Sequence, residues 1–185
     1  MSSTLGTGCD TIIMTGQQLT LWTIRLSLLL YALVVFALLA GPPWSRRSAL
    51  KWLWAASCGV FLIHVALAFH YYHHWSHSAA LAHTADETHR LLGWRFGIGI
   101  YFNYLFAILW AADCLWWLVD EPSYRARPAP LQRLVHLYLF FIAFSGAVVF
   151  EDGIVRWAGV AVTALLGAAL AIRRLGQPRP TAELS

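Results

Sequence analysis

Five stretches of predominantly apolar residues, separated by short polar segments, dominate the pattern of this chain. They cover about residues 19–40, 50–72, 97–119, 134–150 and 154–172. A hydrocarbon core ~30 Å thick needs about 20 apolar residues of helix, and the first three stretches meet that length outright. The pattern predicts an all-α bundle of five transmembrane helices in a single domain over residues 1–185, with a flexible tail at 173–185.

The join between the last two stretches decides between five spans and four. Glu151, Asp152 and Gly153 directly follow the fourth stretch, and two acidic residues before a glycine are typical of a tight reversal. We therefore expect five spans. Without a turn here, the last two stretches would form one over-long or re-entrant helix, and four spans would remain.

The segment before the third stretch has a different pattern. From Ser76 to Leu92, alanines and leucines are interspersed with polar residues such as Asp86 and Glu87, and Gly93 is a helix-ending residue. This amphipathic pattern predicts a helix that lies on the outer surface of the membrane.

Lysines and arginines indicate the orientation. Nine lie in or within two residues of the segments after the first, third and fifth stretches, and three lie in or within three residues of the other segments. The positive-inside rule then places the N-terminus outside and the C-terminus in the cytoplasm.

Because the basic residues form no single face, nucleic-acid binding is not expected. With 59% hydrophobic and 12% charged residues, the chain is too apolar for a soluble domain, and the lipid bilayer is its expected environment.

Tryptophans and small residues add two expectations about the spans. Amphipathic rings favour the membrane boundaries, which predicts two tryptophan belts: Trp22, Trp75, Trp94 and Trp157 outside, and Trp44, Trp52, Trp54, Trp116 and Trp117 inside. The last stretch has small residues four apart, which favour close helix packing within the bundle or with a membrane protein partner: Gly159, Thr163, Gly167 and Ala171.

Histidines supply the main chemical clue, because seven of the eight lie between His64 and His89. If the second span stays helical to Ser78, four of them share one helical face with two i, i+4 pairs: His70, His73, His74 and His77. Neutral imidazole is a ligand for copper and zinc. Glu151 and Asp152 are expected on the same side of the membrane, where they would complete the metal site.

Three other interpretations of this cluster stay open. Haem fits less well, because the other spans hold no histidine at the depth of His70. The histidines would otherwise form a polar helix end at the interface without any cofactor, or a surface that is protonated near pH ~6.

The histidine cluster and the longer segment that contains it each resemble known proteins. His70-x-x-His73-His74 resembles one histidine box of the membrane fatty-acid desaturase and hydroxylase family, which uses three boxes on the cytoplasmic face to hold two irons. One box is present here, on the opposite predicted face, so that activity is not carried over. From about His64 to Trp117 the chain is similar to small uncharacterised bacterial inner-membrane proteins. This resemblance implies a bacterial inner-membrane location and no particular function.

Three ionisable residues inside the spans are candidates for pairing: Arg25, Asp113 and His136. Charge inside a membrane is costly, so each is expected to pair. Asp113 and His136 lie at similar depth and are expected partners, while Glu151, Asp152 and Glu87 are candidates for Arg25. Structural pairing of this kind is favoured over a proton path.

Three functions fit these patterns, and whether the chain is an enzyme stays open. The first is a metal-binding or accessory subunit that holds copper or zinc with the histidine cluster. The second is a metal-dependent membrane enzyme acting on a lipid-like substrate, with Glu87 or Asp86 as its base. The third is a structural membrane subunit without a cofactor.

Overall fold

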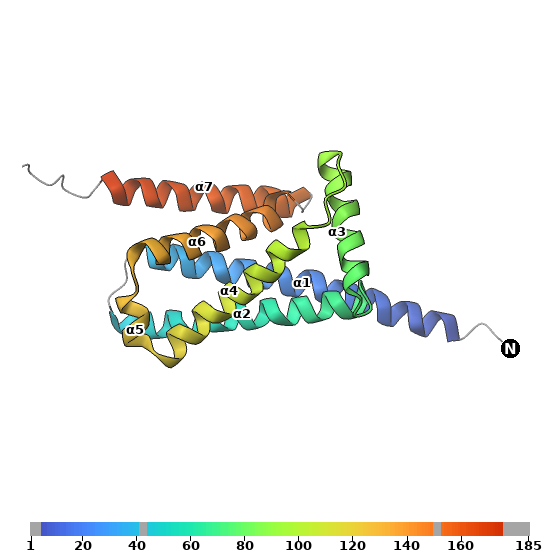
Figure 1. Ribbon diagram of the computed structural model, residues 1–185, viewed down its shortest axis with the longest axis horizontal. Coiled ribbons are helices and arrows are strands. Elements are labelled where there is room, and N and C mark those ends of the chain that lie inside the picture. Colours follow the sequence, from blue (N-terminus) through green and yellow to red (C-terminus); the bar gives the residue numbers. More distant parts are fainter. Residues whose placement is uncertain (1–4, 41–43, 150–152, 176–185) are drawn as a thin grey trace, which may run out of the picture.

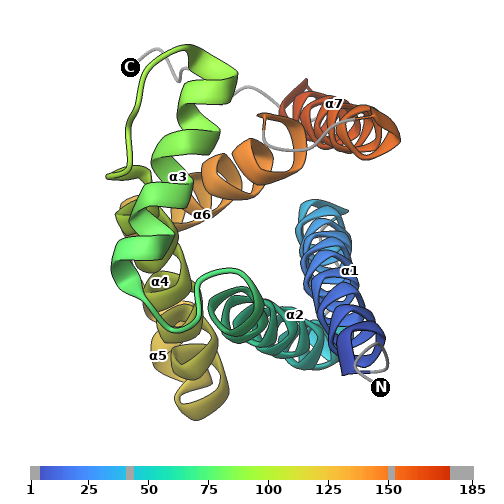
Figure 2. The ribbon, with the colours of Figure 1, turned by 90° about the vertical axis from the view of Figure 1, so that its right-hand side faces the viewer.

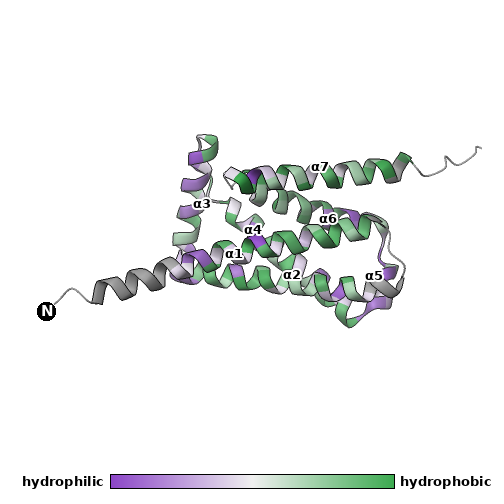
Figure 3. Cartoon of the chain, turned by 180° about the vertical axis from the view of Figure 1, so that it is seen from behind, coloured by the Kyte–Doolittle hydropathy of each residue, from purple (hydrophilic) through white to green (hydrophobic). Residues whose placement is uncertain are grey.

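The structure of the protein is a computed structural model that describes residues 5–40, 44–149 and 153–175, and every regular element in these ranges is helical. Within them, five helical segments are long and apolar enough to cross a membrane: Thr15–Leu39, Ser48–Tyr71, Gly99–Val119, Ala129–Val149 and Gly153–Ile172. The protein is therefore a multi-pass membrane protein, and the predicted all-α bundle of five spans is confirmed. The spanning helices are coloured mostly as hydrophobic in Figure 3.

The five spanning helices lie alongside one another along the long axis of the molecule (Figure 1). They are α1 (Leu5–Ala40), α2 (Trp44–Tyr71), α4 (Gly99–Val119), α6 (Ala129–Phe144) with its π-helical continuation η1 (Ser145–Val149), and α7 (Gly153–Leu175). Helices α6 and α7 run in opposite directions, so the chain reverses between them and the four-span alternative is wrong. Glu151 and Asp152 lie outside the described residues.

Two short helices mark the two ends of the bundle. Helix α3 (His77–Leu92) lies across one end, and α5 (Glu121–Ala126) lies at the other; we call these the α3 end and the α5 end (Figures 1 and 2). Ser76 caps α3 by accepting a hydrogen bond from the Ala79 amide at 3.2 Å, and Gly93 ends it with φ of 82°. The helix predicted for this segment is thus present with nearly the expected bounds, and its location on the outer membrane surface stays a prediction.

The core lies between α1, α2 and α4 and is built from aromatic rings. Trp54 and Trp110 are fully buried with ring centroids 5.2 Å apart, and Tyr31 contacts both at 5.4 Å. Each such pair contributes ~0.5–1.5 kcal/mol beyond its buried area. Ser27 and Ser57 join α1 to α2, because each hydroxyl donates to the other residue's carbonyl at 3.0 and 2.9 Å.

Two buried tryptophans and two helix ends add detail to the spans expected from the sequence. Trp54 and Trp117, two of the tryptophans expected in the inner belt, are buried in the core, where their rings fill the space between helices. Helix α6 begins five residues before the predicted position 134, because Pro130 lies in its first turn, where a missing amide costs nothing. The fifth span ends at Ile172, as predicted, and helix α7 continues to Leu175, into the segment predicted as a tail.

Candidate functional sites

The histidine segment does not form the single helical face predicted from the sequence. Helix α2 ends at Tyr71, and His74 and Trp75 adopt left-handed backbone conformations with φ of 48° and 58°. A tight turn follows, in which the Trp75 amide donates to the Phe69 carbonyl at 2.9 Å. Because this turn breaks the 3.6-residue period, the prediction that four histidines share one face is wrong.

Each of the four histidines has different surroundings. The Trp75 indole N–H donates to His70 Nδ1 at 3.4 Å, His74 is exposed, and the His77 ring hydrogen-bonds the hydroxyls of Tyr104 and Tyr101 at 2.9 and 3.3 Å. In the part of the chain that the structure describes, no group of three or more His, Cys, Asp or Glu side chains is placed to hold a metal ion. Metal binding by these residues therefore stays a prediction.

His73 differs from the other three because it faces inward, toward α3. Its ring centroid lies 5.3 Å from that of His83, and its Nδ1 is buried without a hydrogen-bond partner among the described residues. Burial, followed by the nearby His83 and His74, lowers the pKa of His73 below its ordinary value. A neutral imidazole with one unpartnered nitrogen is thus available at this position.

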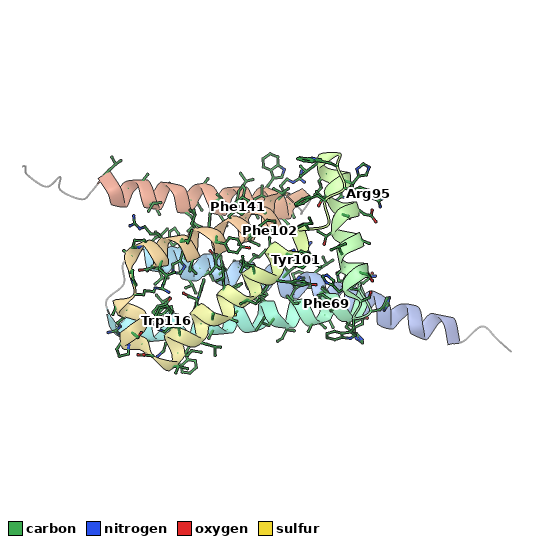
Figure 4. All side chains as sticks on the ribbon, viewed as in Figure 1. Phe69, Arg95, Tyr101, Phe102, Trp116 and Phe141 are labelled. Atoms are coloured by element: carbon green, nitrogen blue, oxygen red, sulfur yellow. The ribbon has the colours of Figure 1, made fainter. Side chains whose placement is uncertain are left out.

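A cavity of about 620 Å³ lies beside His73 in the half of the bundle nearest α3. Helices α1, α2, α4 and α6 form its apolar walls, and Thr84, Glu87 and Thr88 of α3 cover its end. Figure 4 labels three of the aromatic side chains in this half, one each from α2, α4 and α6: Phe69, Phe102 and Phe141. Its volume lies within the ~300–1,000 Å³ range typical of small-molecule sites.

A buried network of charged and polar groups occupies the α5 end. Asp113 accepts hydrogen bonds from the Trp54 indole at 3.0 Å and the Tyr124 hydroxyl at 3.1 Å, and it forms an ion pair with Arg127. Both charged side chains are only 3% exposed. Arg127 also lies 3.8 Å from the Tyr124 ring centroid and donates to His136 Nε2 at 3.2 Å. The expected Asp113–His136 pair is therefore joined through Arg127.

Sequence reasoning placed Arg127 in a loop and missed its role. Helix α5 turns the chain back toward the bundle, which brings Arg127 to the carboxylate of Asp113. The sequence does contain one indication of this role. A carboxylate buried in a span, such as Asp113, is costly without a partner, so a cation from a neighbouring segment is expected beside it.

Several other charged side chains have partners close to the ends of the spans. Lys51 lies 3.0 Å from Glu121, which also pairs with Arg125; these two cations lower the pKa of Glu121, Lys51 having the larger effect. Glu87, one expected partner of Arg25, accepts from Arg90 at 2.9 Å. The Arg25 guanidinium lies 5.8 Å from the Trp22 ring centroid.

Comparison with known proteins gave no match to a protein-family model, a curated protein or a solved structure. The cavity beside His73 and the side chains around it are therefore the basis for a functional proposal.

Proposed function

We propose that this membrane protein binds a lipid-like molecule, with a long apolar body and a small polar head, in the cavity at the α3 end. The cavity itself carries this proposal. Its walls are aromatic and aliphatic, it is large enough for a small ligand, and it lies within helices that span the bilayer, from which apolar molecules can enter. This is the substrate class that the predicted membrane enzyme would use.

The distribution of polar groups suggests how such a ligand would be oriented. His73 and the α3 residues Thr84 and Thr88 line the end of the cavity, whereas Phe141 and Gly146 line its wall on α6 and η1. The polar head would hydrogen-bond the unpartnered His73 Nδ1, and the apolar body would lie against the aromatic wall. A buried polar atom that gains a partner in this way contributes to affinity.

Filling the cavity tests this proposal. Gly146 lines the cavity, and a Cβ at this position would meet nothing within 4 Å, so the side chain of Gly146→Leu would begin in open space at the cavity wall and is expected to take up ligand space. Gly59→Leu is the matched control, because Gly59 also faces open space but does not line the cavity. The probe is a photoactivatable long-chain fatty acid added to protein in nanodiscs.

We expect cross-linking to wild type and to Gly59→Leu, competition by excess unlabelled fatty acid, and at least a several-fold loss in Gly146→Leu. Equal labelling of all three proteins that excess competitor does not reduce would overturn the proposal, because it would reflect only general contact with lipid.

A second candidate function is the predicted metal-binding or accessory role, and the His73–His83 pair favours it. Two imidazoles bound to one tetrahedral ion at ~2.0–2.1 Å have ring centroids about 5 Å apart, close to the observed 5.3 Å. Copper and zinc remain the proposed ions, with His83 replacing His70 and His77 as a ligand. A metal-dependent enzyme would need both this ion and the cavity ligand.

Elemental mass spectrometry separates these metal hypotheses, using protein purified without a polyhistidine tag. Near-stoichiometric copper or zinc that is lost in His73→Ala/His83→Ala and kept in His70→Ala/His77→Ala would support the His73–His83 site. The reverse pattern would favour the sites predicted from the sequence. No metal in wild type, after loading with each ion, would exclude a metal-binding role.

A partner that docks on the small-residue stripe of α7 also stays a proposal. Gly159 already packs against Ala147 and Val148 of η1, and the Thr163 hydroxyl donates to the Gly159 carbonyl at 2.9 Å. Gly167 faces open space and Ala171 is exposed, so a partner helix would use this second half of the stripe.

A further inference from the structure

A second, smaller cavity lies at the α5 end, at the opposite end of the bundle from the proposed lipid-like ligand. Its volume is about 130 Å³, and most of its lining side chains are polar or basic: Tyr124, Arg125, Arg127, Gln132 and His136, with Trp117 beside them. At ~30 Å³ per water molecule, the space corresponds to about four water-sized groups, which is the number of oxygens in a phosphate.

The side chains that line this cavity are basic rather than acidic. Arg127 is paired with Asp113, and Arg125 shares the carboxylate of Glu121 with Lys51. Among the described residues that line the cavity itself, two are arginines and none is a carboxylate. The Gln132 amide adds a neutral hydrogen-bond donor at the cavity wall.

The position of the cavity relative to the spans is also informative. Trp117 lies two residues before the end of one span, and Gln132 lies three residues after the start of the next. The cavity is therefore at the level of a membrane boundary, where phospholipid phosphates lie. The arginine-rich segments at this end are those that the positive-inside rule places in the cytoplasm.

We propose that this cavity binds a phosphate group. Arg125 would supply charge-assisted hydrogen bonds and Gln132 a neutral one, while Arg127, held in its ion pair with Asp113, forms part of the cavity wall. Basic pockets between transmembrane helices at the cytoplasmic face bind anionic lipid head groups. The phosphate would come either from an anionic phospholipid or from free inorganic phosphate, since both present the same oxygens.

Binding can be measured through thermal unfolding in a neutral detergent. The additions are short-chain phosphatidylglycerol, short-chain phosphatidylcholine as a zwitterionic control, and inorganic phosphate. The variants are Arg125→Gln and Gln132→Ala. Arg133→Gln is the matched control, because Arg133 is an exposed arginine near the same end that does not line the cavity and donates to the Ala129 carbonyl.

We expect phosphatidylglycerol to raise the unfolding temperature of wild type and of Arg133→Gln. Arg125→Gln should weaken the apparent affinity about ten-fold or more, as expected for loss of a charge-assisted hydrogen bond. Gln132→Ala should weaken it by a smaller factor. Lys51 still pairs with Glu121 in Arg125→Gln, and its unfolding without lipid shows whether the fold is intact.

The three additions distinguish the source of the phosphate. Stabilisation by phosphatidylglycerol alone supports a lipid head group, and stabilisation that inorganic phosphate also produces supports a site for free phosphate. Equal losses of affinity in Arg125→Gln and Arg133→Gln would overturn the proposal, because they would show only general surface electrostatics. An absence of stabilisation by both anionic additions would overturn it as well. These outcomes do not depend on the α3-end cavity.

Discussion

Asp113 shows how one buried carboxylate can organise an end of a membrane bundle. Three donors from three different elements converge on it: the Trp54 indole of α2, the Tyr124 hydroxyl of α5 and the guanidinium of Arg127, which follows α5. Burying a charge is tolerated only when pairing and hydrogen bonds compensate it. The network therefore fixes α5 and the segment after it against α2 and α4.

Replacing Arg127 should show how much this network contributes to the stability of the fold. We expect Arg127→Met to reduce stability by ~3–5 kcal/mol, because Asp113 would be left charged and unpaired in a buried site. The double variant Asp113→Asn/Arg127→Met should recover part of that loss. Thermal unfolding in detergent measures both; additive losses in the double variant would contradict a coupled pair.

His73 gives a prediction about pH at the scale of one residue. Its folded-state pKa is below the ordinary value of ~6.5, so the unfolded state binds a proton more readily. The stability that this residue contributes is fully present above pH ~6.5 and is lost as the pH falls below it. The groups around it are His74, His83 and Tyr72, with Glu87 and Tyr104 lining the same cavity.

We therefore expect acidification from pH 7.5 to 5.5 (values that bracket ~6.5) to lower the unfolding temperature less in His73→Gln than in wild type. His89→Gln is the control, because His89 is exposed on α3. The same acid sensitivity in wild type and His73→Gln would show that another group titrates.

At the scale of elements, the corner between α2 and α3 determines what the histidines can do. A helix continued to Ser78 would have placed His70 and His74 one turn apart; the left-handed residues His74 and Trp75 separate them. Nothing in the sequence signals this turn, since neither residue is a glycine. His83, which contacts His73, belongs to the next helix and is ten residues away. Sequence spacing alone could not have paired them.

Because α7 packs on η1, substitutions at Gly159 and Gly167 of α7 should affect stability differently. A Cβ on Gly159 would lie 2.9 Å from the Ala147 carbonyl oxygen, whereas one on Gly167 would meet nothing within 4 Å. Gly159→Leu should therefore reduce stability by ~1–3 kcal/mol through overpacking, and Gly167→Leu should leave it unchanged. Thermal unfolding checks both, and a similar effect of the two substitutions would contradict this packing. Loss of an oligomer only in Gly167→Leu would reveal a partner on the open half of the stripe.

At the scale of the whole molecule, the features predicted correctly are those encoded in long, local patterns. The length of the apolar stretches predicted the five spans, and the amphipathic pattern of residues 76–92 predicted α3. The features that the sequence did not reveal depend on several elements at once. Arg127 reaches Asp113 only because α5 turns back, and the large cavity exists only where four spans and α3 meet. Such sites have no local sequence signature.

The orientation of the bundle in the membrane is the last prediction that follows at this scale. The α5 end carries Arg125, Arg127 and Arg133, and the positive-inside rule places it in the cytoplasm. The α3 end would then face outward, and the N- and C-termini would lie outside and inside respectively, since five spans put them on opposite sides. The proposed phosphate site would face the inner leaflet and the lipid-like ligand the outer one.

Cysteine labelling decides this orientation. Ser78 of α3 and Ala126 of α5 are both exposed, and the native Cys58 and Cys114 are buried. In a Cys9→Ser background, a membrane-impermeant maleimide should label Ser78→Cys in intact cells, and Ala126→Cys only after permeabilisation. The opposite pattern would invert the bundle. It would place the basic cavity at the outer leaflet, where the phosphate proposal would lose its support from the positive-inside rule, while the contacts of Asp113, Arg127 and His73 within the bundle would be unchanged.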